Sequence, residues 1–239
     1  MSHYWGWLMS DASPALLRTL AEKADPQHSA LLVIDVQNDF VATGGFFDQV
    51  GGDVHILQEQ RVPRILRLID AARQAGMLVI FVRAIYDPDV LSGPMRERNA
   101  RLNMELPRCI SGSWGAEFYQ VKPLPGEPVI IKHRYSAMVG TPLLDLLEQR
   151  GVRSLLLSGV ATDTCVESAG RDAYFRDYYV TLVEDCCGGA SEEDHRLALK
   201  RFNRDYGLVV NSSDIISVWG DMAPARKTDP ATSEANPTS

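Results

Sequence analysis

Three residues of different chemistry, an acid, a base and a thiol, each stand at the end of a short apolar run. Asp35 lies near the end of one such run, Lys132 ends a second, and Cys165 closely follows a third. Together these groups suit covalent catalysis, in which a thiol attacks an electrophilic carbon while a neighbouring group moves its proton. The sequence therefore predicts a nucleophilic site, provided that the fold brings the three runs together.

The apolar runs are typical of strands buried on both faces of a parallel sheet, because they are short and nearly continuous. Stretches with helical spacing separate them; residues 62–75 are an example, and Gly76 ends that stretch. This alternation predicts an α/β fold with three layers: a doubly wound, mostly parallel six-stranded sheet with helices on both faces. We expect the strands at residues 30–36, 77–82, 129–132, 154–160, 179–184 and 208–210.

The carboxyl ends of parallel strands share one edge of the sheet, where such folds bind their ligands. Asp35, Lys132 and Cys165 are therefore expected to meet there. Residues 164–167 also match the T-x-x-E pattern of a helix capping box. With Thr164 as the cap, Cys165 becomes the first helical residue, and the helix dipole favours its thiolate form.

The chain is expected to form one domain, because it contains no internal repeat and no linker-like segment. Residues 1–27 are expected to form an N-terminal extension, residues 28–220 the single folded domain, and residues 221–239 a disordered tail rich in Pro, Thr, Ser, Ala and Asn. Residues 86–127 are predicted to be a long irregular stretch. Such stretches inside compact domains are often functional.

Composition excludes several functional classes. The net charge of −7, without a basic stripe, argues against a nucleic-acid partner. No apolar run approaches the roughly 18 residues of a membrane span, and the first residues do not resemble a secretory signal. Four cysteines make no disulfide framework, so a cytoplasmic location is expected. The five histidines are scattered, and no metal or cofactor is expected.

Other reactive side chains receive a structural interpretation. Cys109 lies in the irregular stretch without acid–base company, and Cys186 and Cys187 are expected to pack in the core or a loop. Arg83, near the end of the second strand, is a possible ligand for a substrate carboxylate. We favour an exposed or ion-paired arginine there.

Three segments resemble the motifs of the isochorismatase-like cysteine hydrolases, over roughly residues 28–218. Residues 35–40 read D-V-Q-N-D-F, residues 132–137 read K-H-R-Y-S-A, and residues 159–166 read G-V-A-T-D-T-C-V. The order and spacing of the three segments also match that family. The doubly wound sheet that the resemblance implies agrees with the fold predicted above.

The resemblance implies a role for each site residue. Asp35 takes the thiol proton and passes it to the leaving amine, and Lys132 holds the pair and helps to keep the sulfur anionic. Cys165 attacks the carbonyl carbon to form a thioester, while the backbone N–H groups of Ala161 and Cys165 bind the oxyanion. The resemblance further implies a cis peptide between Val160 and Ala161.

Within this family the chain looks nearest to the ureidoacrylate, N-carbamoylsarcosine and biuret amidohydrolases. The expected function is therefore cleavage of a C–N bond in a small amide, ureido or carbamoyl compound. Nicotinamidases are less similar, because no histidine lies near the second strand. Two alternatives stay open: a vinyl-ether hydrolase in which Asp35 protonates the substrate and Cys165 is dispensable, and a non-catalytic family member.

The substrate is expected to contact aromatic side chains that follow or flank the motifs. The candidates are Phe40, Trp114 and Tyr135. Because members of the family usually associate as dimers or tetramers, the resemblance also implies a homo-oligomer.

Overall fold

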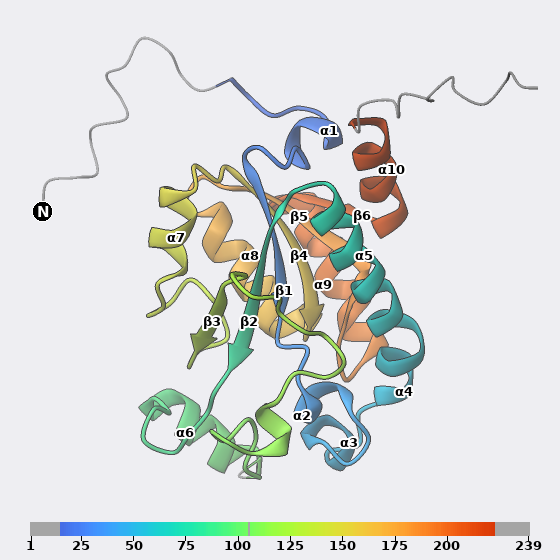
Figure 1. Ribbon diagram of the computed structural model, residues 1–239. Helices are drawn as coiled ribbons and strands as arrows, with labels where there is room; N and C mark the ends of the chain where they lie inside the picture. The colour runs from blue at the N-terminus through green and yellow to red at the C-terminus, as the bar shows by residue number, and fades with distance from the viewer. Residues whose placement is uncertain (1–14, 105, 223–239) are drawn as a thin grey trace, which may run out of the picture.

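A computed structural model describes residues 15–104 and 106–222 of the chain (Figure 1). The first 14 residues of the expected extension and the tail from residue 223 onward lie outside the described residues. The strands are β1 (Ser29–Ile34), β2 (Leu78–Ala84), β3 (Val129–Lys132), β4 (Ser154–Val160), β5 (Tyr179–Gly188) and β6 (Leu208–Val210).

The α-helices fall mostly between the strands. They are α1 (Leu20–Lys23), α2 (Asn38–Val41), α3 (Phe46–Gln49), α4 (Val54–Ile56), α5 (Val62–Gln74), α6 (Gly93–Arg101), α7 (Leu143–Gln149), α8 (Glu167–Tyr174), α9 (Glu192–Asp205) and α10 (Ser212–Met222). Two π-helical turns, η2 (Leu57–Arg61) and η4 (Thr162–Val166), and a 3-10 turn, η3 (Trp114–Ala116), complete the described elements.

The strands form one six-stranded sheet in the order β3-β2-β1-β4-β5-β6, and every pairing is parallel. The predicted α/β fold is therefore confirmed. The strand order reverses between β1 and β4: from β1 the chain adds β2 and β3 on one side, and from β4 it adds β5 and β6 on the other. Parallel sheets bind ligands at such a switch point, outside the carboxyl ends of the strands.

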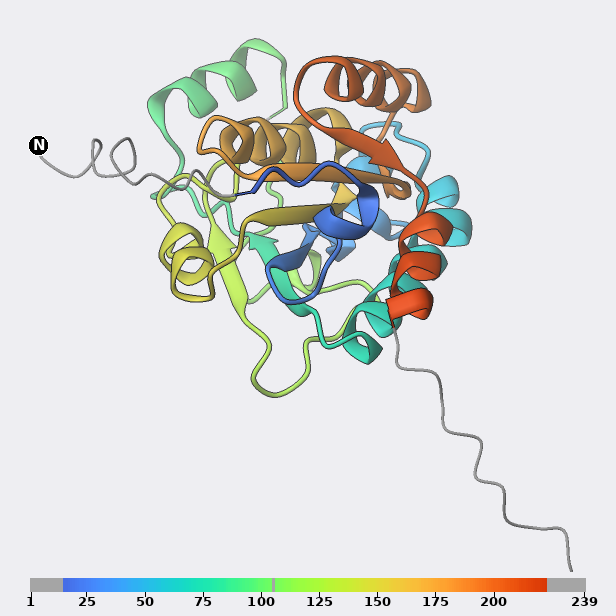
Figure 2. The same cartoon turned by 90° about the horizontal axis from the view of Figure 1, so that it is seen from above.

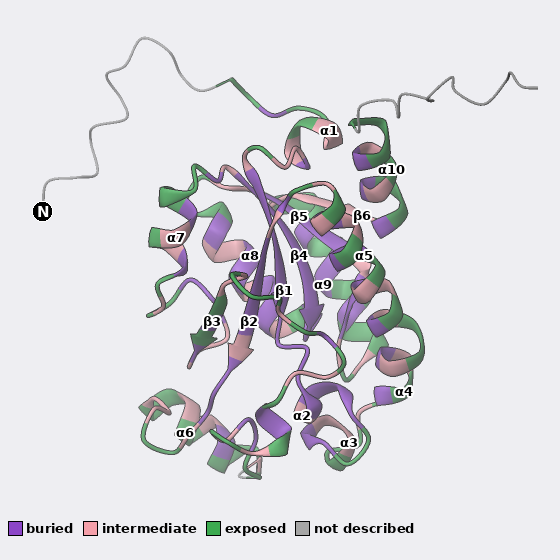
Figure 3. Ribbon diagram, in the orientation of Figure 1, coloured by how far each residue is buried: buried purple, intermediate pink, exposed green. Residues whose placement is uncertain are grey.

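Two hydrophobic clusters cover the two faces of the sheet, and Figure 2 shows the resulting layers from above. One cluster packs α5 and α10 on the sheet through residues such as Ile65, Leu68 and Trp219. The other packs α7, α8 and α9 through Leu147, Ala169 and Phe202. The central strands are correspondingly buried (Figure 3).

The burial of each strand follows its place in the sheet. Every residue of β1 and β4 is buried, as their continuous apolar sequences predict. The edge strand β3 alternates instead, so that Val129 and Ile131 are exposed while Lys132 points inward. Where β1 and β4 pair, Gly159 has φ +119°, and a β-carbon there would collide with the carbonyl of Ile34.

Three local predictions differ from the structure. Strand β5 continues to Gly188, four residues beyond the predicted end, so it includes Cys186 and Cys187. The stretch 86–127 contains α6 and η3 rather than irregular chain alone. Helix α6 buries only Asn99, so its sequence has no apolar stripe from which a helix is predicted.

Candidate active site

The three chemically active residues come from three strands, β1, β3 and β4, at one edge of the sheet. Asp35 directly follows β1, where its positive φ of 52° ends the strand, and its N–H donates to the Val82 carbonyl at 2.9 Å. Lys132 is the last residue of β3, and Cys165 lies in the π-helical turn η4 after β4. The predicted convergence is therefore present.

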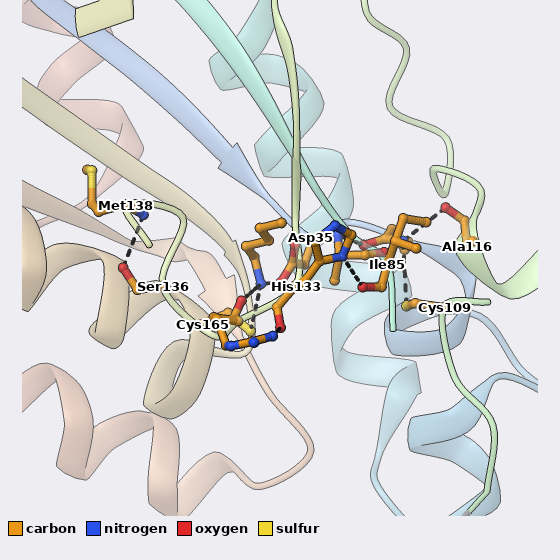
Figure 4. A network of polar contacts seen from close by, with 12 residues as sticks. Asp35, Ile85, Cys109, Ala116, His133, Ser136, Met138 and Cys165 are labelled. Atoms are coloured by element: carbon orange, nitrogen blue, oxygen red, sulfur yellow. Dashed lines mark hydrogen bonds and ion pairs between the residues drawn. The ribbon is translucent and has the colours of Figure 1, made fainter. Parts of the chain in front are cut away.

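Lys132 stands between the acid and the thiol. Its Nζ lies 2.7 Å from Asp35 Oδ2 and donates to Cys165 Sγ at 3.4 Å and to the Arg134 carbonyl at 3.0 Å. Three acceptors match the three donors of an ammonium group. Asp35 and Lys132 are fully buried, and Cys165 is 5% exposed. Figure 4 shows Asp35 and Cys165 within this network of polar contacts.

Burial and the neighbouring charges shift the pKa values of all three groups. The pKa of the Cys165 thiol is raised to about 12, mainly by burial and also by the Asp35 charge, while Lys132 acts to lower it. Burial also raises the pKa of Asp35, while Lys132 opposes the shift. Burial alone lowers the pKa of Lys132, but the charges of Asp35 and Cys165 raise it overall. The raised pKa of Cys165 favours its thiol form, in contrast to the thiolate that the sequence predicts.

The predicted capping box is also absent. Helix α8 begins at Glu167, and the hydroxyl of Thr164 donates to Asp163 at 3.3 Å. The Glu167 carboxylate binds Arg171 at 2.5 Å and lies 3.8 Å from Arg201. Because arginines occupy this carboxylate, it does not reach back to cap the turn. Cys165 lies inside the π-helical turn and not at a helix start.

The turn η4 also shapes the predicted oxyanion site. The Val160–Ala161 peptide is cis, as the resemblance implies. The Ala161 carbonyl accepts hydrogen bonds from the N–H groups of Thr164 at 3.2 Å and Val166 at 3.1 Å. The N–H of Cys165, which lies between them, is not a donor to that carbonyl. Binding of an oxyanion by Ala161 and Cys165 stays a prediction.

Residues just after Asp35 hold a loop beside the site. The side-chain amide of Gln37 is fully buried; it donates to the carbonyls of Ala84 and Ala116 at 2.9 Å each and accepts from the Ala84 N–H at 2.8 Å. Asn38 donates to the Trp114 carbonyl at 2.7 Å. These bonds tie β2 and the loop 109–119 to the segment that carries Asp35.

The Asp39 carboxylate extends this anchor. Its Oδ2 accepts the N–H of Cys109 at 2.5 Å, and a side chain at Gly115 would collide with it. Gln37, Asn38 and Asp39 belong to the D-V-Q-N-D-F motif that already signals Asp35. The sequence does not reveal their role as loop anchors, because their partners lie 47 to 79 residues away.

The predicted substrate contacts lie in three different environments. Phe40 is 6% exposed and packs on Phe47, with ring centroids 5.1 Å apart. Tyr135 is partly buried against the α7–α9 cluster. Trp114 is 56% exposed. Their contact with a substrate stays a prediction.

The remaining cysteines and Arg83 have structural surroundings. Cys109, Cys186 and Cys187 are buried free thiols. The Gln37 amide lies 3.5 Å from Cys109 Sγ, so this cysteine is nearer to the site than predicted.

Arg83 is partly buried against the Phe118 ring, and among the described residues no carboxylate lies within 4 Å of it. The expected ion pair of Arg83 is therefore absent from the described part of the chain.

Of a metal site, a hollow away from the reactive edge and a membrane-spanning helix, the described ranges contain a hollow. Between residues 15 and 222, residue 105 excepted, no group of three His, Cys, Asp or Glu side chains is arranged to hold a metal ion. A hollow of about 360 Å³ lies at the opposite, amino-terminal edge of the sheet, lined by residues such as His28, Glu127 and Arg150. No helix of the described ranges is long and apolar enough to cross a membrane.

Comparison with known sequences matches most of the chain to one family. The family model of the isochorismatase domain matches residues 29–214. A curated relative, the ureidoacrylate amidohydrolase RutB of Enterobacter sp. (strain 638), is 33% identical over 215 residues, which cover 84% of this chain and 93% of the relative.

Solved structures show the same fold. A cysteine hydrolase from Pseudomonas syringae pv. phaseolicola 1448A superimposes with a TM-score of 0.73 at 24% identity, over 88% of this chain and 99% of that one. The N-carbamoylsarcosine amidase from Thermoplasma acidophilum gives a TM-score of 0.63 at 25% identity, over 77% and 96%. The nicotinamidase PncA from Bacillus subtilis gives 0.65 at 29% identity, over 77% and 99%.

Proposed function

Because the chain belongs to the isochorismatase family, we propose that it is a cysteine amidohydrolase that cleaves a C–N bond of a small amide, ureido or carbamoyl compound. The observation that carries this proposal is the contact of Lys132 with both Asp35 and Cys165 in a buried cluster. An acid and a thiol held by one cation are the parts that nucleophilic attack on a carbonyl requires.

The first half of the reaction forms a thioester. Asp35 takes the proton of Cys165 as the sulfur forms a bond to the carbonyl carbon, and the carbonyl oxygen becomes an oxyanion. The C–N bond then breaks, and the nitrogen leaves with the proton from Asp35 as ammonia or an amine. The raised pKa of Asp35 suits both tasks, because an acid–base group works best near the operating pH.

The second half releases the product. Asp35 takes a proton from water, the resulting hydroxide adds to the thioester carbon, and the S–C bond breaks. The acid product leaves, and Cys165 recovers its thiol proton from Asp35. In both halves Lys132 stabilises negative charge on the sulfur, and the N–H groups of Ala161 and Cys165 stabilise the oxyanion. One such donor is typically worth about 3–4 kcal/mol of activation energy.

The ureido and carbamoyl class is proposed on the basis of the relatives. The curated relative at 33% identity is a ureidoacrylate amidohydrolase, and one structural neighbour is an N-carbamoylsarcosine amidase. Both names describe hydrolysis at a carbonyl bonded to nitrogen. The thioester route fits such substrates, whereas a vinyl ether offers the sulfur no carbonyl carbon.

The test is ammonia release from a panel of ureidoacrylate, N-carbamoylsarcosine, biuret, nicotinamide and N-carbamoyl amino acids. We expect at least one compound to release ammonia with the wild type and none with Cys165→Ala or Cys165→Ser. Cys187→Ala is the matched control, because that thiol is equally buried but packs in β5. Full ammonia release by both Cys165 variants would reject Cys165 as the nucleophile. Absence of ammonia from the wild type with every compound of the panel would favour a vinyl-ether hydrolase or a non-catalytic protein.

A further inference from the structure

Arg108 is a buried cation beside the site that the mechanism does not use. The residue is 8% exposed, and its guanidinium lies over two aromatic rings, 4.9 Å from the centroid of Phe46 and 5.5 Å from that of Tyr86. Its Nη2 donates to Asn99 Oδ1 at 3.2 Å. In the described ranges, no carboxylate lies within 4 Å of this guanidinium.

A cation in this position is costly. Arginine is almost never buried without a partner, because the ionised group loses its hydration. Stacking on aromatic rings and one bond to a neutral amide return only part of that loss. Two partly buried arginines do have carboxylate partners, whereas Arg83 has none among the described residues: Arg61 pairs with Glu192 at 3.2 Å, and Arg73 pairs with Glu127 at 2.8 Å. The guanidinium of Arg108 can therefore take an anionic partner from outside the protein.

The Tyr86 ring connects this guanidinium to the reactive groups. Lys132 Nζ lies 5.8 Å from the centroid of the same ring on which Arg108 stacks. The Tyr86 hydroxyl is itself buried and has no hydrogen-bond partner among the described residues. The next residue, Cys109, is fixed through its N–H to Asp39 and through its sulfur to the Gln37 amide. The guanidinium thus belongs to the anchored loop beside Asp35 and not to a distant surface.

We propose that Arg108 binds a carboxylate group of the substrate and that Tyr86 supplies a second donor to it. The planar guanidinium presents parallel N–H donors that match the two oxygens of a carboxylate. The substrate class is then an acid that carries its scissile amide or ureido group a few bonds from the carboxylate. This inference rests on the proposed function for the position of the scissile group, but the binding of the acid is testable without turnover.

The test measures binding to Cys165→Ala, which cannot form a thioester. Calorimetry compares 3-ureidopropionate with its methyl ester, which has the same ureido group but no charge. We expect the acid to bind more tightly than the ester, and Arg108→Met to weaken acid binding by about 10- to 150-fold while ester binding changes less than threefold. Tyr86→Phe is expected to weaken acid binding severalfold.

Two further variants keep the result interpretable if Arg108→Met folds poorly. Arg108→Lys retains the charge and loses the planar fork, so it is expected to give intermediate acid affinity. Arg101→Met removes an exposed arginine of α6 that pairs with Glu97, and it is expected to leave both affinities unchanged. Inorganic phosphate serves as a competing anion and is expected to bind more weakly than the acid.

Equal affinity for acid and ester, equal losses of both in Arg108→Met, or phosphate binding as tight as that of the acid would overturn the assignment. The proposed function fails in a different way, because its failure is the absence of ammonia from the wild type. Acid binding that depends on Arg108, without ammonia release, would retain the carboxylate site and reject the amidohydrolase.

Discussion

Lys132 Nζ lies 2.7 Å from Asp35 Oδ2, and neither residue has any exposed surface. A buried ion pair is a weak source of stability, because removing two charges from water costs about as much as their attraction returns. The ion pair of Lys132 and Asp35 matters here for the reaction and not for stability. The same ammonium contacts Cys165 Sγ at 3.4 Å, so the pair stabilises the sulfur when Asp35 has taken its proton.

The pH dependence of hydrolysis follows from these pKa shifts. The reaction needs Asp35 as a carboxylate, and burial raises the pKa of that group above 3.8. We expect kcat/KM to fall as the pH decreases through this raised pKa, at a higher pH than for an exposed aspartate. The Cys165 thiol has a pKa of about 12, so no alkaline loss is expected below about pH 10. An acid limb centred at pH 4 or below, or an alkaline limb near pH 8, would contradict this assignment.

Substitution of Asp35 is expected to separate thiol reactivity from turnover. The Asp35 charge raises the pKa of Cys165 and Lys132 lowers it, so Asp35→Asn lowers the pKa of the thiol from about 12. Alkylation of Cys165 by iodoacetamide at pH 8 should then be faster than in the wild type, while hydrolysis falls by about 10²–10⁴-fold. Lys132→Met removes the opposite charge beside the thiol, so both alkylation and hydrolysis are expected to slow. Mass spectrometry of the Cys165 peptide measures the rates, and slower alkylation of Asp35→Asn would contradict the charge assignment.

The loop beside the site is expected to depend on Gln37. Gln37→Ala removes three buried hydrogen bonds and leaves the N–H and C=O of Ala84 and the C=O of Ala116 without that partner. Each buried polar group that loses its partner costs about 1–3 kcal/mol, so we expect a loss of roughly 3 kcal/mol in the free energy of unfolding. Urea denaturation measures it. Gln49→Ala, which removes one exposed bond to Gly44, should change stability by less than about 0.5 kcal/mol.

The sheet and its reactive edge were predictable because short, local stretches of sequence determine them. The runs that became β1 and β4 are apolar throughout, which marks strands covered on both faces. Since parallel strands end at one edge, the positions of Asp35, Lys132 and Cys165 after such runs were sufficient to predict that they meet.

The features that were not predicted depend on contacts distant in sequence. Thr164 and Glu167 have the spacing of a capping box, but Arg171 and Arg201 bind the glutamate and the chain forms a π-helical turn. The raised pKa of Cys165 comes from burial, which a local motif does not report. The environment of Arg108 arises because Phe46 and Tyr86, from two other segments, enclose it.

The contact between Thr162 and His195 leads to a prediction about the position of η4, the turn that follows Ala161 and contains Cys165. Thr162 Oγ1 and His195 Nδ1 lie 2.8 Å apart and are buried, and this bond fixes the residue after Ala161 to helix α9. Burial lowers the pKa of His195, so the ring is neutral at pH 7. Thr162→Val keeps the volume and removes the bond. We expect kcat to fall about tenfold with KM unchanged within twofold, because a misplaced turn weakens oxyanion stabilisation more than substrate binding.

Steady-state kinetics on the best substrate of the panel measures this separation. Thr162→Ser retains the hydroxyl and should restore most of kcat. Thr164→Val is the matched control two residues along, because its hydroxyl contacts only Asp163 among the described residues. A purely structural role for Thr162 would instead lower the melting temperature and leave kcat of the folded enzyme unchanged. That result would show that η4 keeps its shape without α9, and it would leave the backbone of the turn itself to position the N–H groups of Ala161 and Cys165.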